Sequence, residues 1–313
     1  MPYDSIINRT DAATLIPEDY ATGIIKGMTE RSAAMQRFRR APMANSQQRM
    51  SVLSALPTAY FVTGDTGQKQ TTDTAWANKY LNAEEIAVIV PVPENVVEDT
   101  AYNIYDEIVP LVQEALGRTL DAAVFFGTNK PSSWPDAIAT TCTSISHKVV
   151  RGTASQATGG LATDLSNAAG LVEADGFDVN GYVTSKSFRK HLRNARATDG
   201  QKLMDISTGT IDGEPVSYVM SGMFPTAVSS PEMFLGDWDQ FILGVRKDIT
   251  WKIATEGVIQ DNTGAIVYNL LQQDMVALRF VMRVAWQVSN YVTFSNTTEA
   301  TRYPLAMLEG PAS

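Results

Sequence analysis

Hydrophobic and polar positions alternate almost without interruption from Met275 to Val288. One face of this segment carries only apolar side chains: Val276, Leu278, Phe280, Met282, Val284, Trp286 and Val288. Arg279, Arg283 and Gln287 fall on the other face. Because successive side chains on a strand point to opposite faces, the pattern predicts one strand with a buried face. At about 3.3 Å per residue it would span roughly 45 Å, far more than the usual five or six residues.

A second long element is predicted upstream, from Pro93 to Ala123. Its apolar residues recur at spacings of three and four: Val97, Ala101, Ile104, Ile108, Leu111, Ala115, Leu116, Leu120 and Ala123. This period is typical of an amphipathic helix, here about 45 Å long. Pro110 lies in its middle and removes one backbone hydrogen bond, at a cost of about 3 kcal/mol in a straight helix. We therefore expect a bend near Asp106, and Gly127 to end the helix.

Residues 48–92 predict a long, exposed β-hairpin. Its two strands are expected at residues 50–62 and 85–92, on either side of a tip rich in Gly, Thr and Asp at residues 64–73. Residues 1–45 have scattered apolar positions and predict an arm with one helix. This arm contains a basic cluster: Lys26, Arg31, Arg37, Arg39 and Arg40.

The remaining segments predict shorter elements. Residues 136–160 are rich in Thr, Ser and Gly and are expected to be irregular. Helices are expected at 161–174 and 185–195, and a turn at Asp199–Gly200. Strands are expected at 177–183, in the segment that follows the turn within 210–216, at 234–245 and at 249–253. Together these elements predict an α+β chain.

Composition limits the class of protein. The 313 residues allow one large domain or two smaller ones, and 44% hydrophobic with 19% charged residues is ordinary for a globular chain. A net charge of −9 argues against a broad nucleic-acid-binding surface, which needs Lys and Arg to replace counterions. The longest apolar run, residues 86–93, is too short to cross a membrane, and the first twenty residues contain no secretory signal. Synthesis inside the cell, without membrane attachment, is the expectation.

The sequence contains none of the common catalytic or ligand-binding motifs that we looked for. No nucleotide-binding glycine loop, HExxH, GxSxG or EF-hand spacing occurs, and two histidines with one cysteine do not predict a zinc site. We expect His147 and His191 to be solvated surface residues and Cys142 to be an incidental thiol. No catalytic, cofactor-binding or metal-binding residue is predicted. The basic cluster at 26–40 is either a nucleic-acid-binding surface or a helix face that is solvated or pairs with a partner. No aromatic residues interleave with it to stack on bases, which favours the helix face.

Several local motifs, in order along about 270 residues, resemble the major capsid protein of tailed bacteriophages. The matching stretches are Leu15–Glu18, Val90–Glu94 with Val97–Asp99, Phe125–Thr128, Leu203 through Thr210–Val216, Phe234–Trp238, Val245–Arg246, and Ala277–Arg279 with Arg283. The family shares its shell fold with encapsulin nanocompartments and the floor of herpesvirus capsids.

The resemblance implies an α+β shell fold with four parts. These are an N-terminal arm at 1–45, an extended β-hairpin loop at 46–92, a peripheral domain with spine helix and long strand at 93–155 and 246–290, and an axial domain at 156–245 and 291–313. It also implies self-assembly into hexamers and pentamers of an icosahedral head. That head encloses double-stranded DNA without sequence-specific binding, and it forms in the host cytoplasm as part of the virion.

Partners and contacts follow from the same resemblance. Scaffolding is expected to come from a separate protein or not to be needed, and a portal and a decoration protein are further expected partners. The candidate inter-subunit contacts are Arg31, Arg37, Arg39, Arg40, Lys69, Trp76, Lys79 and Pro110. Some members crosslink a hairpin lysine to an asparagine of a neighbour. Lys69 and Lys79 lie in that region, Asn262, Asn290 and Asn296 lie late in the chain, and no motif singles out a pair.

Two alternatives remain open at this point. One is an encapsulin-like compartment for protein cargo, and the other is a soluble α+β hydrolase. DNA or a cargo enzyme inside purified particles would separate the first from a phage head. A compact monomer of 34.1 kDa on gel filtration would favour the second.

Overall fold

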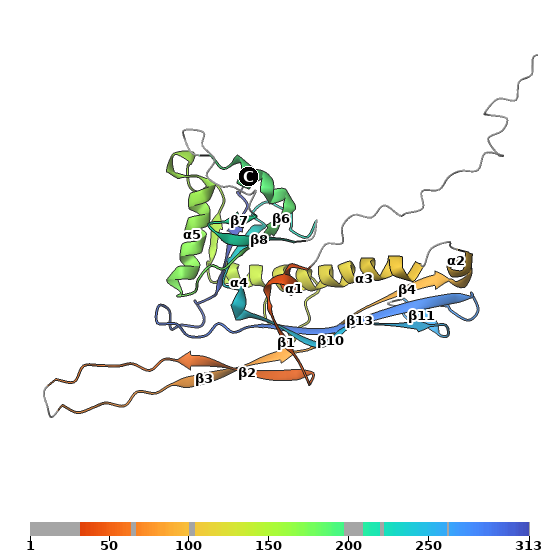
Figure 1. Cartoon of the computed structure of the whole chain (residues 1–313), viewed down its shortest axis with the longest axis horizontal. Helices are drawn as coiled ribbons and strands as arrows, with labels where there is room; N and C mark the ends of the chain where they lie inside the picture. The colour runs from red at the N-terminus through yellow and green to blue at the C-terminus, as the bar shows by residue number, and fades with distance from the viewer. Residues whose placement is uncertain are drawn as a thin grey trace, which may run out of the picture.

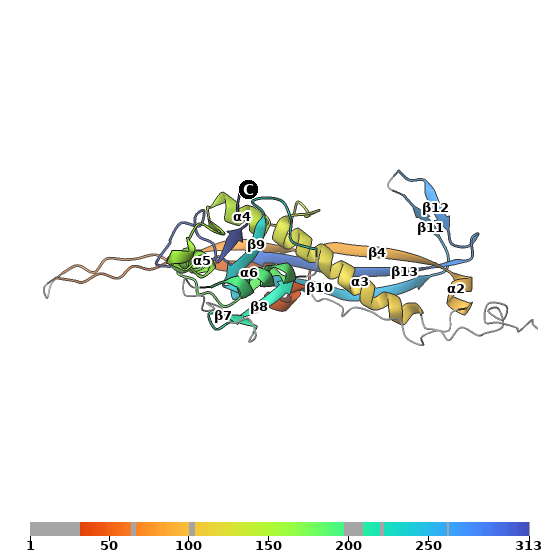
Figure 2. The same cartoon turned by 90° about the horizontal axis from the view of Figure 1, so that it is seen from above.

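The computed structural model describes residues 32–63, 67–99, 104–196, 209–219, 222–261 and 263–312. The molecule is elongated, with a long hairpin projecting at one end and a two-layer body of helix on sheet extending to the other (Figures 1 and 2). A more compact unit with its own sheet lies beside the hairpin end of this body. The predicted helix region at residues 17–31, Arg31 itself, the turn at residues 199–200 and Asn262 all lie outside the described residues.

The long alternating segment is a strand, as predicted. β13 (Met275–Val288) lies inside a four-stranded sheet of order β1-β10-β13-β4, which we call the spine sheet. The other strands of this sheet are β1 (Arg39–Pro42), β10 (Phe241–Ala254) and β4 (Glu84–Pro93), and β13 pairs with β10 and β4. Phe280, Val284 and Trp286 are almost fully buried on one face, where they join a core with side chains of the spine helix. Each such burial stabilises the fold by about 1.5–3 kcal/mol.

The described residues of the predicted spine helix are helical from Glu94 onward. The described helices are α2 (Glu94–Asp99) and α3 (Ile104–Asp121), followed by a short π-helical turn, η1 (Ala122–Phe126). Gly127 ends the element with a φ of 74°, a left-handed conformation that suits glycine, which confirms the predicted stop. Pro110 lies inside α3, and the bend expected near Asp106 stays a prediction.

The hairpin pairs differently from the prediction. β2 (Gln47–Ala55) pairs antiparallel with β3 (Ala75–Asn82), and residues 56–63 and 67–74 continue beyond this ladder. The expected return strand at residues 85–92 is instead β4, which pairs with β13 in the spine sheet. Apolar alternation in β4 marks a half-buried strand but does not identify its partner, whereas β3 is polar enough to read as loop.

The compact unit contains a six-stranded sheet of order β5-β14-β9-β6-β8-β7. Its strands are β5 (Lys148–Val150), β6 (Tyr182–Ser185), β7 (Thr210–Ile211), β8 (Glu214–Val219), β9 (Pro231–Gly236) and β14 (Leu305–Glu309). The expectation of an irregular segment at 136–160 was wrong in part, because α4 (Ile138–Ser144) and β5 lie within it. The helices predicted at 161–174 and 185–195 are confirmed as α5 (Leu161–Ala174) and as η3 (Lys186–Phe188) with α6 (Arg189–Asn194).

The strands expected at 234–245 and 249–253 are divided otherwise, into β9 and the single long β10. The remaining described elements are α1 (Ala33–Arg37), β11 (Val258–Gln260), β12 (Ile266–Asn269), η2 (Gln156–Thr158) and η5 (Trp238–Gln240). One buried cluster contains side chains from both sheets, such as Phe280 of β13 and Phe234 of β9, together with Phe38, Phe125 and Trp238. The two sheets therefore share a core.

Candidate assembly surfaces and the joint between the sheets

The start of the described chain is held by a buried carboxylate at the end of the spine helix. Asp121 accepts hydrogen bonds from the Ser32 hydroxyl and from the backbone N–H groups of Ala33 (2.9 Å) and Ala34 (3.1 Å). These donors belong to the first turn of α1, whose N–H groups have no partner inside the helix. Burial raises the pKa of Asp121 to about 6, against the opposing effect of these hydrogen bonds.

The described residues of the basic cluster, Arg37, Arg39 and Arg40, have different surroundings, and Lys26 and Arg31 lie outside the described residues. Arg37 is half-buried and donates from Nε to the Ser217 hydroxyl (2.7 Å) and from its guanidinium to the Pro215 carbonyl, so it ties the arm to the compact unit. Burial lowers its pKa. Arg40 donates to the Met35 carbonyl (3.1 Å), and Arg39 is exposed at the edge strand β1.

The projecting hairpin exposes large apolar side chains. Phe61 is fully exposed at 103% and Trp76 at 65%, and Tyr60, Val62 and Tyr80 are also exposed. Beyond the β2–β3 ladder the two arms are joined by contacts such as the Tyr60 hydroxyl donating to the Gln70 carbonyl (2.7 Å). An isolated two-stranded hairpin with exposed aromatic residues and free edges is a surface for pairing with another chain.

The crosslink candidates are placed in different surroundings. Lys69 is exposed on the hairpin, whereas Lys79 forms an ion pair with Glu299 of the same molecule (2.9 Å). Asn290 is buried and donates to the Arg302 carbonyl (2.8 Å), and Asn296 donates to the Asp175 carboxylate (2.7 Å). Crosslinking stays a prediction.

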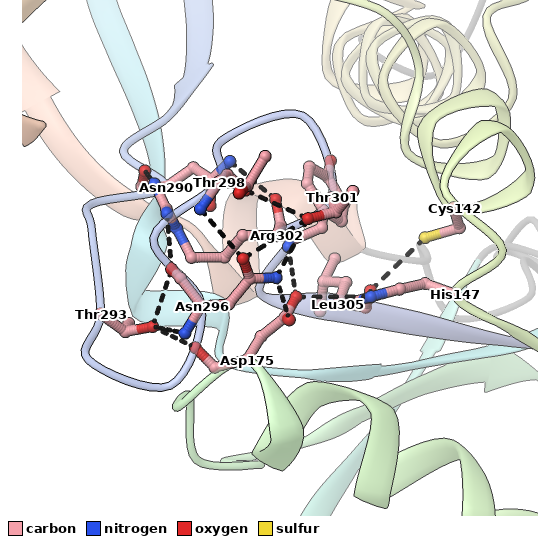
Figure 3. A network of polar contacts seen from close by, with 11 residues as sticks. Cys142, His147, Asp175, Asn290, Thr293, Asn296, Thr298, Thr301, Arg302 and Leu305 are labelled. Atoms are coloured by element: carbon pink, nitrogen blue, oxygen red, sulfur yellow. Dashed lines mark hydrogen bonds and ion pairs between the residues drawn. The ribbon is translucent and has the colours of Figure 1, made fainter.

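A buried polar network joins the two sheets (Figure 3). The segment between β13 and β14, residues 289–304, has no regular secondary structure and is fixed largely by Asp175, just after α5. One carboxylate oxygen of Asp175 accepts from the Asn296 amide, and the other accepts from the Tyr303 N–H (2.8 Å). The Thr293 hydroxyl donates to the Asp175 carbonyl (2.6 Å). We call these residues the Asp175 joint.

His147 belongs to this joint, so the expectation of a solvated surface histidine was wrong for it. The side chain is buried, with Nε2 3.3 Å from the Asp175 carboxylate and Nδ1 3.3 Å from the Leu305 carbonyl. The polar neighbours in sequence suggested exposure, but the ring faces a carboxylate that lies 28 positions later in the chain. Long-range pairs of this kind have no local sequence signal.

Reactive or metal-binding arrangements are absent from the part of the chain that the structure describes. It contains no group of three or more His, Cys, Asp or Glu side chains that could hold a metal ion. Cys142 is fully buried in α4, and burial raises the pKa of its thiol, which disfavours the reactive thiolate. In the same described residues, no helix is both long and apolar enough to span a bilayer.

Comparisons with known proteins agree on one family. The model of the phage capsid family matches residues 12–295. The major capsid protein of Staphylococcus phage 80alpha is 26% identical over 308 residues, which cover 96% of this chain and 90% of that protein. A solved structure from Microbacterium phage Oxtober96 has a TM-score of 0.85 at 37% identity, covering 98% of this chain and all of that one. A structure from Mycobacterium phage Bobi has the same TM-score at 30% identity, covering 99% and 100%.

Proposed function

This chain belongs to the phage capsid family and builds the shell of the virion as a structural subunit, and from that premise we propose how its surfaces divide the work of assembly. Proteins of this family are structural, so the chain is not an enzyme. The relatives reported above are phage proteins, which sets aside the cargo compartment and the hydrolase. Copies of the chain join one another in hexamers and pentamers of an icosahedral head around double-stranded DNA, without reading its sequence.

The observation that supports this proposal is the exposed β2–β3 hairpin. A monomer gains nothing from a fully exposed Phe61 and a largely exposed Trp76 on a projecting ladder. If a neighbouring copy covers the hairpin, the apolar area leaves water and contributes about 25 cal/mol per Å². The contact is heterologous, since a hairpin on one copy meets the body of another, and such contacts close into rings. Lys69 and Trp76 on this hairpin are the contact residues we propose first.

The division of the chain into arm, hairpin loop, peripheral domain and axial domain is part of the proposal. The spine sheet with α3 corresponds to the peripheral domain, and the six-stranded sheet to the axial domain. Arg39 and Arg40 at the start of the body are further contact candidates, as are Lys79 and Pro110. A separate scaffolding protein, a portal and a decoration protein complete the proposed set of partners.

Shortening the hairpin tests the proposal. Replacing residues 57–73 by a short Gly-containing turn keeps the β2–β3 ladder and removes the exposed tip. We expect the variant to fold with an unchanged melting temperature, since the tip lies outside both cores, but to remain as free subunits or small rings by gel filtration and negative-stain microscopy. As a matched control, Asp73→Asn removes one exposed charge from the same region and should leave assembly intact. Shells of native diameter from the shortened chain would overturn the proposed role of the hairpin.

A further inference from the structure

The acidic charge of the chain is concentrated in one segment. Residues 80–117 contain no Lys, Arg or His. They carry eight carboxylates: Glu84, Glu85, Glu94, Glu98, Asp99, Asp106, Glu107 and Glu114. The segment forms β4 and then the helical layer of the spine, α2 and most of α3. This segment therefore carries eight negative charges and no positive one, two of them on β4 and six on α2 and α3.

The neighbouring strands carry the opposite charge on the face away from α3. In the β10–β13 ladder, Lys252 lies directly opposite Arg279, and Lys247 lies directly opposite Arg283. These residues lie on the face opposite Phe280 and Val284, whose side chains enter the core. Like charges directly opposite each other on one face of a sheet destabilise it. Such a pair of like charges occurs twice along the β10–β13 ladder.

One of the two cation pairs has no compensating carboxylate in the ladder. Arg283 is in register with Glu85 on the next strand, but Arg279 is in register with Ile89. Lys252 and Arg279 are both exposed, and neither forms an ion pair with another of the described residues. Ile89, in register with Arg279, is 48% exposed. Lys252, Arg279 and Ile89 form what we call the cationic patch.

The helix α2 carries a surface that matches this patch. Glu94 and Glu98 are exposed and lie one turn apart, which places their Cβ atoms about 5–6 Å from each other. Residues directly opposite each other across a sheet, as Lys252 and Arg279 are, have Cβ atoms about 4.5–5.5 Å apart. The charges and the spacing of the two surfaces therefore agree.

We propose that, in the assembled shell, the cationic patch of one subunit binds α2 of a second copy of this chain. The inference rests on the proposed self-assembly and adds a specific contact to it. Among the described residues, no ion pair joins α2 to the patch of the same molecule, although the end of β4 before α2 pairs with the start of β13. Because the patch and α2 are different surfaces, the contact is heterologous and joins successive subunits around a symmetry axis.

Nucleic acid is the competing occupant of a cationic surface. Phosphate contacts require many Lys and Arg residues spread along a backbone, whereas this patch is one cation pair beside an exposed isoleucine. Apolar contact beside charge is typical of protein interfaces. The second copy is therefore the occupant that the surface favours, and DNA becomes an outcome of the test.

A charge swap tests the contact in the full chain. The double variant Lys252→Glu/Arg279→Glu should raise the protein concentration needed for shell assembly by about tenfold or more, because like charges now face each other. Adding Glu94→Lys/Glu98→Lys to the same chain should restore assembly, since attraction returns with reversed signs. Light scattering and negative-stain microscopy at a series of protein concentrations measure both effects.

The control variant Lys190→Glu/Arg193→Glu makes the same change in net charge on exposed residues of α6, away from the patch. It should assemble at the wild-type concentration. Wild-type assembly of the patch variant would overturn the contact while leaving self-assembly itself intact. The contact would also be overturned if the variant with all four substitutions failed to assemble although the patch variant folds. A patch variant that forms normal empty shells and loses only the capacity to retain DNA would overturn it as well, because DNA would then be the occupant of the patch. A wild-type chain that never assembles would instead contradict the proposed function.

Discussion

At the scale of single residues, three buried carboxylates hold separate segments of the chain together by accepting hydrogen bonds. Asp121 caps the first described helix, Asp164 accepts from the backbone N–H groups of Gly152 (2.7 Å) and Ala154 (2.9 Å), and Asp175 fixes the segment between the sheets. A buried carboxylate is costly unless several donors surround it, and each of these has at least two. The sequence shows three ordinary aspartates, and only long-range structure distinguishes them from the exposed ones.

Asp121 gives the subunit a specific pH dependence. Its pKa is raised from 3.8 to about 6 in the folded chain, so the folded state binds the proton more tightly than the unfolded state. The stabilisation is therefore fully present below about pH 4 and is lost as pH rises through 6, by up to about 3 kcal/mol. We expect Asp121→Asn to flatten this part of the profile when the unfolding of unassembled subunits is measured from pH 4 to 7. Identical slopes for the wild type and the variant would contradict this linkage.

At the scale of elements, the hydrophobic pattern of the sequence predicts the strand and helix of the spine, but it does not predict the Asp175 joint. The alternation in β13 and the helical period of α3 are strong because each element buries one continuous face. The pairing of β2 with β3 was missed because β3 contains Asn78, Lys79 and Asn82, which read as loop. The Asp175 joint was missed altogether, since its segment has no secondary structure and its partners come from distant parts of the chain.

The Asp175 joint is expected to control the angle between the two sheets. Asp175→Asn leaves one acceptor oxygen where two are used, and we expect a loss of about 2–4 kcal/mol together with shells of mixed diameter in electron micrographs. Asp164→Asn is a matched control, because it removes an equivalent acceptor from the same helix but affects contacts within one unit only. It should lose comparable stability and keep uniform shells. Uniform shells from both variants, or mixed shells from both, would show that the joint does not control the angle.

At the scale of the whole molecule, the elongated shape and the exposed hairpin are those of a subunit of a larger assembly. The family resemblance predicted the α+β shell fold and the structural role, and the comparisons confirm both. Exposed aromatic residues on the hairpin and the cationic patch on the spine sheet are surfaces that no described part of the same molecule covers. The periodicity of hydrophobic residues does not predict such contacts between molecules, because it indicates only which faces are buried within one chain.

We propose that the spine bends at Pro110 and that this bend differs between an immature and an expanded shell. It interrupts the hydrogen-bond ladder of α3, and Pro110→Ala restores one bond and removes the clash with the preceding turn. We expect the variant subunit to be more stable and its particles to expand more slowly or less completely, as followed by a change in particle diameter over time. Unchanged particles with unchanged expansion would remove this role.

The order of strands has a consequence for synthesis on the ribosome. β13 and β14, interior strands of the two sheets, occupy residues 275–288 and 305–309 of a chain of 313. The apolar faces of α3, β4 and β9 are translated long before the strands that cover them, so they stay uncovered in the nascent chain until β13 and β14 have been synthesised. Ribosome-bound chains stalled before residue 275 should therefore remain sensitive to protease and engage chaperones, and a resistant stalled chain would show that folding begins without either strand.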